Sequence, residues 1–377
     1  MSIDTIYESL NLFFRKNEDV LKLPIEVDFG KDVRNALSNR WAQYVDLIKN
    51  HNCLEECIPI IEKSISFINA SIDAYYCGDF IFATENIGWL IDELLKNHKH
   101  LIIEDLESNY IDVEYAQWFR ARVGDNYPFE KKEMTHIPAN KRGKIGSNRY
   151  TSNGIPCLYI GNSIYVCWEE LRRPPIDELW VSRFWPTNSV KLLNLSITGG
   201  DLINSQYCLK HVRGSENAYK QAIIEFFSLW ILQSACSVKV KEKDRAFREE
   251  YIVPQLLTQT LKKHGLDGIM YFSTSVPKVY LNNCSWISKM IAIPAFDLNK
   301  SMFSEKIETH FSMSYPINLG MLQHHLISNQ RLNNRYEPSN NYARKGATVW
   351  VSSRGSRYDN TLFFECEDQL LEKIYWD

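Results

Sequence analysis

The sequence lacks the patterns that identify several common classes of protein. Its nine cysteines form no paired CxxC array, so we expect no structural zinc or other metal, and reduced thiols in a cytoplasmic protein. The most apolar run, Ala222 to Cys236, contains Glu225 and Gln233 and is too short and too polar to span a bilayer. The first residues show neither the basic start nor the small-residue cleavage site of a signal peptide.

An excess of positive charge is missing as well. Lys and Arg total 43 against 46 Asp and Glu, which argues against a nucleic-acid-binding protein. There is no Gly-x-Gly-x-x-Gly dinucleotide motif and no Gly-x-Ser-x-Gly nucleophile elbow. His324-His325 has no acidic or cysteine partner at ligand spacing. With 45% hydrophobic residues over 377 positions, we expect a globular chain of about two or three domains.

The first hundred residues predict helices. Apolar side chains recur at helical spacing between Val33 and Ile48, between Ile58 and Ile68, and between Ile87 and Leu95. Asp32 and Thr84 are expected as N-caps.

After about residue 110 the pattern changes to short β-rich runs that alternate with helical stretches, which favours an α+β domain with a central sheet. The expected strands are 155–160, 179–185, 190–195, 268–273 and 290–294, and the expected helices are 163–173, 216–236 and 251–264. Beyond about residue 300 the chain turns polar and Asn-rich. A hairpin of 347–351 with 361–366 and a short helix over 368–376 are expected there.

One segment carries most of the functional signal. Arg149 is followed by Tyr159 ten residues later and by Glu170 twenty-one residues later, across a turn, an apolar strand and a helical turn. A cation, an aromatic face and a carboxylate in one such unit suit a nucleotide with its phosphate, flat base and sugar. A second signal runs from His264 to Thr274, with Ser273 at the end of a buried strand pattern.

These segments, taken together, resemble the RES domain over about residues 115 to 295. The first family motif appears as Arg149, Gly154-Ile155-Pro156, Leu158-Tyr159-Ile160 and Cys167-Trp168-Glu169-Glu170-Leu171-Arg172. The later motif appears as Tyr251, Gln255, Gly265, Asp267-Gly268-Ile269, Tyr271 and Ser273, and the upstream one as Phe119 to Arg122. Two positions depart from the family: Thr151 replaces an Asn, and Cys167 stands where a small residue is usual.

The resemblance implies a domain order. Residues 1–108 would be a helical domain similar to HEPN bundles, 109–298 a RES domain with a central mixed sheet and an ADP-ribosyltransferase-like fold, and 299–377 an extension packed on it. Many HEPN bundles are RNases with an Arg-x4-6-His motif. Here Arg40 and His51 are eleven residues apart, which argues against a nuclease.

The resemblance also implies an activity, that of an NAD-consuming toxin of a toxin–antitoxin system. NAD would be the substrate, cleaved between nicotinamide and ribose, and a protein antitoxin, usually Xre-like in that family, or an immunity protein would be the partner. A protein ADP-ribosyltransferase with a protein acceptor is the alternative, and a non-catalytic scaffold is an alternative of another class. Trp168, two residues before Glu170, replaces an acid that many arginine-specific transferases carry, which favours NAD breakdown.

Each candidate residue has an expected role. Glu170 would stabilise the oxocarbenium-like centre that forms when the glycosidic bond breaks. Arg149, with Arg120 as second choice, would grip the pyrophosphate with its planar fork. Tyr159 would stack on nicotinamide and Ser273 would hydrogen-bond its amide or a phosphate.

A structural role remains open for each of these residues. Arg149 could be a surface cation in a basic loop, Tyr159 a core residue, Glu170 part of a solvated face, and Ser273 an ordinary strand-end serine. Glu169 competes with Glu170 for the catalytic position. We favour Glu170 because Glu-Leu-Arg-(Arg)-Pro then matches the family's Glu-ϕ-Arg-Pro.

Overall fold

The computed structural model describes residues 3–97, 101–106, 117–124, 129–152, 154–203, 216–242, 245–276, 285–298, 301–324, 348–351 and 354–371. The chain forms two compact units. Unit 1 comprises Met1–Ile103, Gly146–Asn153 and Lys191–Asn282, and unit 2 comprises Glu104–Ile145, Gly154–Val190 and Asn283–Asp377. The expected division at residues 108 and 298 is linear, whereas the chain passes between the units several times. The reason is that later helices pack on the N-terminal ones.

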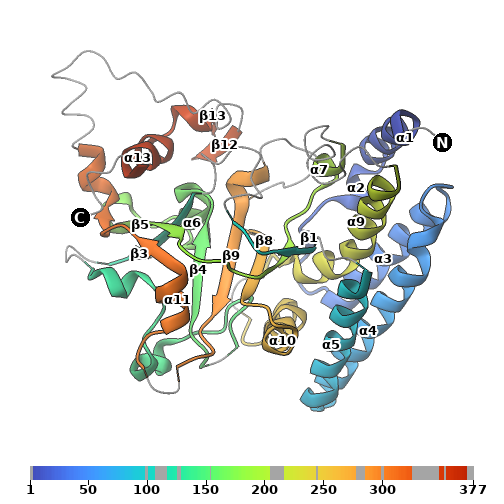
Figure 1. Cartoon of the computed structure of the whole chain (residues 1–377), viewed down its shortest axis with the longest axis horizontal. Helices are drawn as coiled ribbons and strands as arrows, with labels where there is room; N and C mark the ends of the chain where they lie inside the picture. Colours follow the sequence, from blue (N-terminus) through green and yellow to red (C-terminus); the bar gives the residue numbers. More distant parts are fainter. Residues whose placement is uncertain are drawn as a thin grey trace. The chain divides into compact units, whose positions relative to one another are not determined.

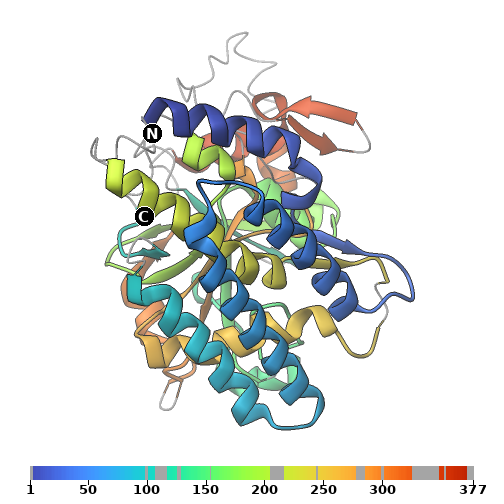
Figure 2. The ribbon, with the colours of Figure 1, turned by 90° about the vertical axis from the view of Figure 1, so that its right-hand side faces the viewer.

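Helices form most of unit 1. They are α1 (Ile3–Lys16), α2 (Glu18–Leu21), α3 (Val33–Lys49), α4 (Ile58–Tyr76), α5 (Phe80–Asn97), α7 (Gly199–Ile203), α9 (Glu216–Cys236) and α10 (Ile252–Thr260). Helix α4 packs against α3, α5 and α9, and α10 packs against α5 (Figures 1 and 2). The three predicted apolar stripes all lie on helices, and α9 has the bounds expected from its pattern.

The helix starts agree with the sequence at one of two predicted caps. The side chain of Asp32 accepts a hydrogen bond from the main-chain N–H of Asn35, as an N-cap should. The prediction for Thr84 is wrong, because α5 begins four residues earlier. There Asp79 accepts from the N–H of Phe82 at 3.0 Å, and the Thr84 hydroxyl donates to the carbonyl of Phe80 inside the helix.

Aromatic side chains fasten α3 to α9 in the core of unit 1. Tyr44 stacks on Trp230 with ring centroids 4.1 Å apart, and its hydroxyl donates to the carbonyl of Phe227 at 2.7 Å. Trp41 donates from Nε1 to the hydroxyl of Ser234 at 2.9 Å. Both polar tips are thus satisfied in a buried setting, which fixes the register of the two helices.

Unit 1 also contains strands. β2 (Ile102–Ile103) runs antiparallel to β6 (Leu192–Leu195), and β6 runs parallel to β8 (Gly268–Phe272). β1 (Ile25–Val27) pairs in parallel with β7 (Val238–Val240). Since β6 and β8 are parallel, the residues that follow them, including Ser273, leave the sheet at one edge.

Unit 2 contains an antiparallel sheet in the order β10 (Phe311–Met313), β5 (Leu179–Pro186), β3 (Trp118–Val123), β4 (Cys157–Gly161) and β9 (Lys289–Pro294). β11 (Ile317–Asn318) also pairs with β5. The fold is therefore α+β, with parallel and antiparallel strand pairs, as expected. Two helices of this unit are α6 (Ile164–Glu170) and α11 (Glu305–His310).

The C-terminal part of unit 2 differs from the expected hairpin. β12 (Thr348–Val351) pairs with β13 (Arg354–Arg357), while residues 361–366 belong to helix α13 (Leu362–Leu371) and its N-cap region. The predicted second strand is wrong because the buried positions Phe363, Glu367 and Leu370 recur at helical spacing. Residues 368–371 of the expected helix 368–376 belong to α13, and residues 372–376, like the Asn-rich stretch 329–341, lie outside the described residues.

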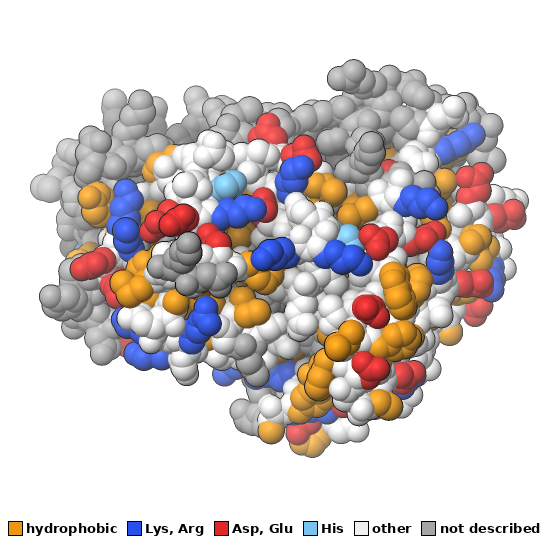
Figure 3. All heavy atoms as spheres, turned by 60° about the horizontal axis from the view of Figure 1, so that its bottom comes forward, with side chains coloured by type: hydrophobic (Ala, Val, Ile, Leu, Met, Phe, Trp, Pro, Cys, Tyr) orange, Lys and Arg blue, Asp and Glu red, His pale blue; other side chains and the backbone are white. Residues whose placement is uncertain are grey.

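The surface in Figure 3 mixes charges of both signs with patches of hydrophobic side chains. Several large apolar side chains of α5 are exposed, among them Ile81 at 76% and Phe80 at 56%. Within the described ranges, no helix combines the length and the apolar character that crossing a membrane requires.

Candidate functional site

Unit 1 holds Arg149 in a fixed position. Its guanidinium lies 5.3 Å from the ring centroid of Tyr251. Nη1 donates to the carbonyl of Cys236 at 2.9 Å, and Nη2 donates to the carbonyl of Val238 at 2.8 Å and to the Thr274 hydroxyl at 3.0 Å. Arg149 is therefore not a solvated cation of a surface loop, because three charge-assisted hydrogen bonds hold its side chain in one position.

The loop that carries Arg149 is fastened by Gln255. Its amide nitrogen reaches the hydroxyl of Ser147 at 2.8 Å and the carbonyls of Asn148 and Thr151 at 3.0 and 3.1 Å. Two residues of the later motif, Tyr251 and Gln255, therefore both act on the Arg149 segment. Thr151, which replaces the family's Asn, is 2% exposed and contributes its carbonyl to this contact.

Ser273 lies directly after β8, next to the threonine that Arg149 contacts. The side chain is 1% exposed, and its hydroxyl oxygen accepts from the N–H groups of Ser275 at 3.0 Å and Val276 at 3.4 Å. Its visible role is to shape the turn that follows the strand. Unit 1 thus places Arg149 in contact with Thr274, the residue that follows Ser273.

In unit 2, helix α6 separates the two competing acids. Glu169 is buried, and its two carboxylate oxygens each accept at 2.9 Å from Nε and Nη2 of Arg173. The guanidinium of Arg173 also lies 5.5 Å from the ring centroid of Trp168. Glu170 is half-buried. The ion pair gives Glu169 a structural role, and Glu170 stays the predicted catalytic acid.

The turn after α6 is strained. Arg172 and Arg173 have φ angles of 64° and 58°, a left-handed conformation that favours glycine. The N–H of Arg172 donates to the carbonyl of Glu169 at 3.0 Å, and that of Arg173 to the carbonyl of Trp168 at 2.9 Å. This is a Schellman cap with arginine in the glycine position. Retained strain of this kind is typical of functional sites.

Tyr159 and Arg120 meet on neighbouring strands. Nη1 of Arg120 on β3 donates to the carbonyl of Tyr159 on β4 at 2.9 Å. Tyr159 is half-buried, whereas its strand neighbours Leu158 and Ile160 are fully buried. Its side chain therefore differs from an ordinary core residue of this strand.

A second arginine stands beside Arg120. In the antiparallel register Arg120 lies opposite Ser182 and Arg122 opposite Trp180, so all four side chains leave the same face of the sheet. Five polar atoms of these four side chains are buried and have no hydrogen-bond partner among the described residues: Nε of Arg120, Nε and Nη2 of Arg122, Nε1 of Trp180 and the hydroxyl of Ser182. Arg122, Trp180 and Ser182 were not among the predicted site residues. The Arg-x-Arg spacing of Arg120 and Arg122 on one strand could have indicated that both arginines share a face of the sheet.

The electrostatics of this cluster follow from burial. The pKa of Arg120 is lowered to about 9. Burial is the main cause, and the positive charge of Arg122 contributes to the same shift. Burial also lowers the pKa of His136, whose neighbours include both arginines. A face with two crowded guanidinium groups and unused donors is suited to an anion with several oxygens.

Cys167 on α6 links the arginine cluster to Glu170. Its thiol donates to the carbonyl of Phe119 at 3.2 Å, and burial raises its pKa to about 12, with opposing contributions from Arg120 and Glu170. Both charged groups are thus its electrostatic neighbours. In the sheet Phe119 lies opposite Gly161, so Tyr159 and Gly161 lie on the face that α6 covers, and the side chain of Arg120 leaves the other face.

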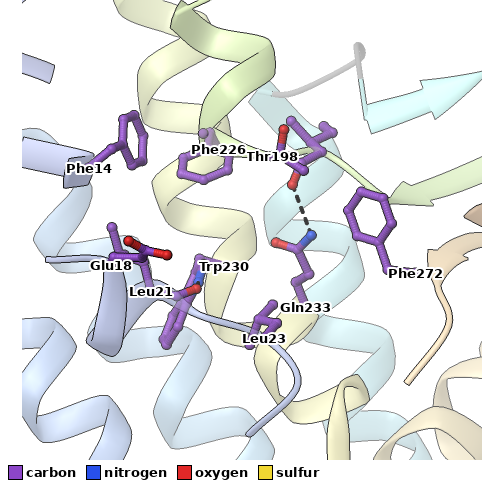
Figure 4. Close-up of a pocket in the computed structure, with 11 residues that line it drawn as sticks. Phe14, Glu18, Leu21, Leu23, Thr198, Phe226, Trp230, Gln233 and Phe272 are labelled. Atoms are coloured by element: carbon purple, nitrogen blue, oxygen red, sulfur yellow. Dashed lines mark hydrogen bonds between the residues drawn. The ribbon is translucent and has the colours of Figure 1, made fainter. Parts of the chain in front are cut away.

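A cavity in unit 1 lies apart from the predicted residues. Figure 4 shows the rings of Phe14, Phe226, Trp230 and Phe272 around it, with the carboxylate of Glu18 at its margin. Its volume is about 40 Å³, room for a few water molecules rather than a nucleotide. None of the predicted site residues lines it. Among the described residues, no group of three His, Cys, Asp or Glu is placed to hold a metal ion.

Comparison with known proteins identifies the family. No family model matches the chain. The Bacillus subtilis (strain 168) protein named "Putative toxin YopC" is 30% identical over 324 residues, which cover 83% of this chain and 72% of that protein. The chain belongs to the YopC family. Membership in the YopC family supports a toxin role, while the RES resemblance stays a prediction.

One solved structure is similar at a low level. The Mycobacterium tuberculosis MbcT–MbcA toxin–antitoxin complex aligns over 61% of this chain and 95% of that chain, with a TM-score of 0.30 and 10% identity. A likeness of that size carries no argument about fold or function.

Proposed function

We propose that this YopC-family toxin cleaves NAD between nicotinamide and ribose. The observation that carries the proposal is the pair Arg120 and Arg122: Nε of Arg120 and Nε and Nη2 of Arg122 are buried and lack acceptors among the described residues. A pyrophosphate supplies acceptor oxygens and two negative charges, so it would relieve both the lost hydrogen bonds and the repulsion between the arginines.

The carboxylate of Glu170 supplies the chemistry in this proposal. When nicotinamide leaves, positive charge develops on the ribose, and a nearby carboxylate stabilises that charge more than it stabilises the bound substrate. Tyr159 lies on the face of the sheet that α6 covers, and its ring would stack on the nicotinamide there. Arg149 and Ser273, which belong to unit 1, stay predicted NAD-binding residues.

Hydrolysis is favoured over transfer to a protein by one observation. The position two residues before Glu170 is Trp168, whose Nε1 donates to the carbonyl of Pro174 at 2.9 Å. The adjacent acid, Glu169, is bound through both oxygens to Arg173. A second carboxylate that could activate a protein acceptor is therefore not offered beside Glu170, and water is the better acceptor.

A toxin that consumes NAD would act in the cytoplasm of the cell that makes it, so something must restrain it there. We propose a protein antitoxin as the partner. Its class, Xre-like or otherwise, is decided by co-purification with the product of a neighbouring gene and by loss of NAD cleavage in the complex.

The test measures nicotinamide released from NAD by the purified chain, beside Glu170→Gln and the matched control Glu169→Gln. We expect Glu170→Gln to lose about 100-fold or more in kcat, and the control to keep most activity once its fold is verified by circular dichroism. Equal activity of wild type and Glu170→Gln would overturn the assignment. No nicotinamide release by the wild-type protein, with growth arrest unaffected by Glu170→Gln, would favour the scaffold alternative.

A further inference from the structure

A buried carboxylate from the C-terminal extension contacts the start of helix α6. Glu367 on α13 is 0% exposed. Its Oε1 accepts hydrogen bonds from the main-chain N–H of Ile164, the first residue of α6, and from the hydroxyl of Tyr358. The hydroxyl of Ser163 accepts from the N–H of Val166 at 3.0 Å, so two acceptors hold the first turn.

The rest of the extension covers the same helix. Tyr165 on α6 lies 6.4 Å from Tyr358 and 5.8 Å from Phe363, measured between ring centroids. Trp168, one turn further on, lies 5.2 Å from Phe363. Helices α6 and α13 are packed together in Figure 1. Aromatic contacts and a buried polar anchor therefore act on one short helix.

Helix α6 needs such support. It has seven residues, and helices this short are not stable without tertiary contacts. Ile164 and Glu170 are fewer than two helical turns apart, about 9 Å along the axis. A displacement of the helix at Ile164 therefore also displaces Glu170. The strained turn after Glu170 means that the other end is not free to absorb that shift.

We propose that the segment 358–370 of the extension positions α6, and that Glu367 is its positioning residue. The proposal rests on the proposed function, in which Glu170 acts on the substrate. Glu367 touches no reacting atom; it acts through the helix. Residues 358–370 are then part of the enzyme rather than a separate appendage.

The perturbations are Glu367→Leu, which removes the acceptor, and Glu367→Gln, which keeps one oxygen in place. We expect Glu367→Leu to lower kcat for nicotinamide release about 10- to 100-fold with KM changed less than about threefold, because misplacement by about 1 Å affects the transition state most. Glu367→Gln should recover to within about threefold of wild type. Glu365→Gln on the same helix, a half-buried acid, is the matched control and should be unchanged.

Hydrogen exchange of the peptide 164–170 tests whether Glu367 holds α6 in place, and this measurement does not depend on enzyme activity. We expect faster exchange in Glu367→Leu, near wild-type exchange in Glu367→Gln, and protection elsewhere in unit 2 kept. Loosened α6 with unchanged kcat would overturn the proposal, as would lost activity with α6 protection intact. Should Glu367→Leu fail to fold, Tyr358→Phe, which removes one donor to the carboxylate, is read by the same two measurements.

Failure of the proposed function is distinguishable. If the wild-type protein releases no nicotinamide, the proposed function fails, and exchange together with growth arrest still tests Glu367. If Glu367→Leu loses both growth arrest and the exchange protection of α6, the positioning role is supported. If Glu367→Leu still arrests growth although α6 has lost its protection, the positioning role is overturned.

Discussion

Replacing Arg120 by methionine should make the protein more stable and less active. Moving the pKa of this guanidinium from 12.5 to about 9 corresponds to about 5 kcal/mol against the charged form. The side chain is only half-buried, so water screens part of this penalty, and Met retains most of the buried volume. We therefore expect stabilisation of about 1–3 kcal/mol at neutral pH.

The pH dependence has a definite sign. Below about pH 9 Arg120 is charged in the folded and unfolded states alike, so its penalty is fully present at neutral pH. Above that value the folded state releases the proton first, and the penalty fades until the unfolded state follows near 12.5. The stability advantage of Arg120→Met should therefore shrink as pH rises above about 9.

Urea unfolding at about pH 7 and pH 10 measures both statements, with the exposed Arg142→Met as control, which should change stability by less than about 0.5 kcal/mol. ADP-ribose should raise the melting temperature of wild type more than that of Arg120→Met, because only wild type keeps the Arg120 guanidinium to bind the pyrophosphate. A destabilised Arg120→Met would refute the reasoning, since it would mean that the guanidinium is already compensated in the absence of an anion.

Two further changes test the strained turn and the Arg149 loop. Arg172→Gly should stabilise the protein by about 1 kcal/mol, because φ at this position is 64°; unchanged or lower stability in urea unfolding would show that the arginine side chain compensates the strain. Gln255→Leu should destabilise by about 1–3 kcal/mol, because three polar contacts to 147–151 are lost, and an unaltered midpoint would contradict that account.

Much of the local structure could be predicted because it depends on residues close in sequence. The stripe from Val33 to Ile48 and the cap at Asp32 specify α3, whereas the choice of Glu170 over Glu169 stays a prediction. The prediction of Thr84 as an N-cap was wrong because Asp79, five residues earlier in the chain, caps the first turn of α5. The first residues of α13 were predicted as a strand because a run of adjacent apolar residues fits either a strand or a buried helix, whereas residues 368–371 fall in the expected helix.

Other features depend on residues far apart in the chain. The sequence alone determined which segments are helices or strands and which polar residues stand at their ends. Only the tertiary structure decided that Arg149 donates to carbonyls nearly ninety residues away, that Arg120 and Arg122 share a face with unused donors, and that Glu367 holds the first turn of α6. The physical reason is that periodicity and capping act within about one turn, whereas burial and hydrogen-bond satisfaction depend on the partners that packing provides.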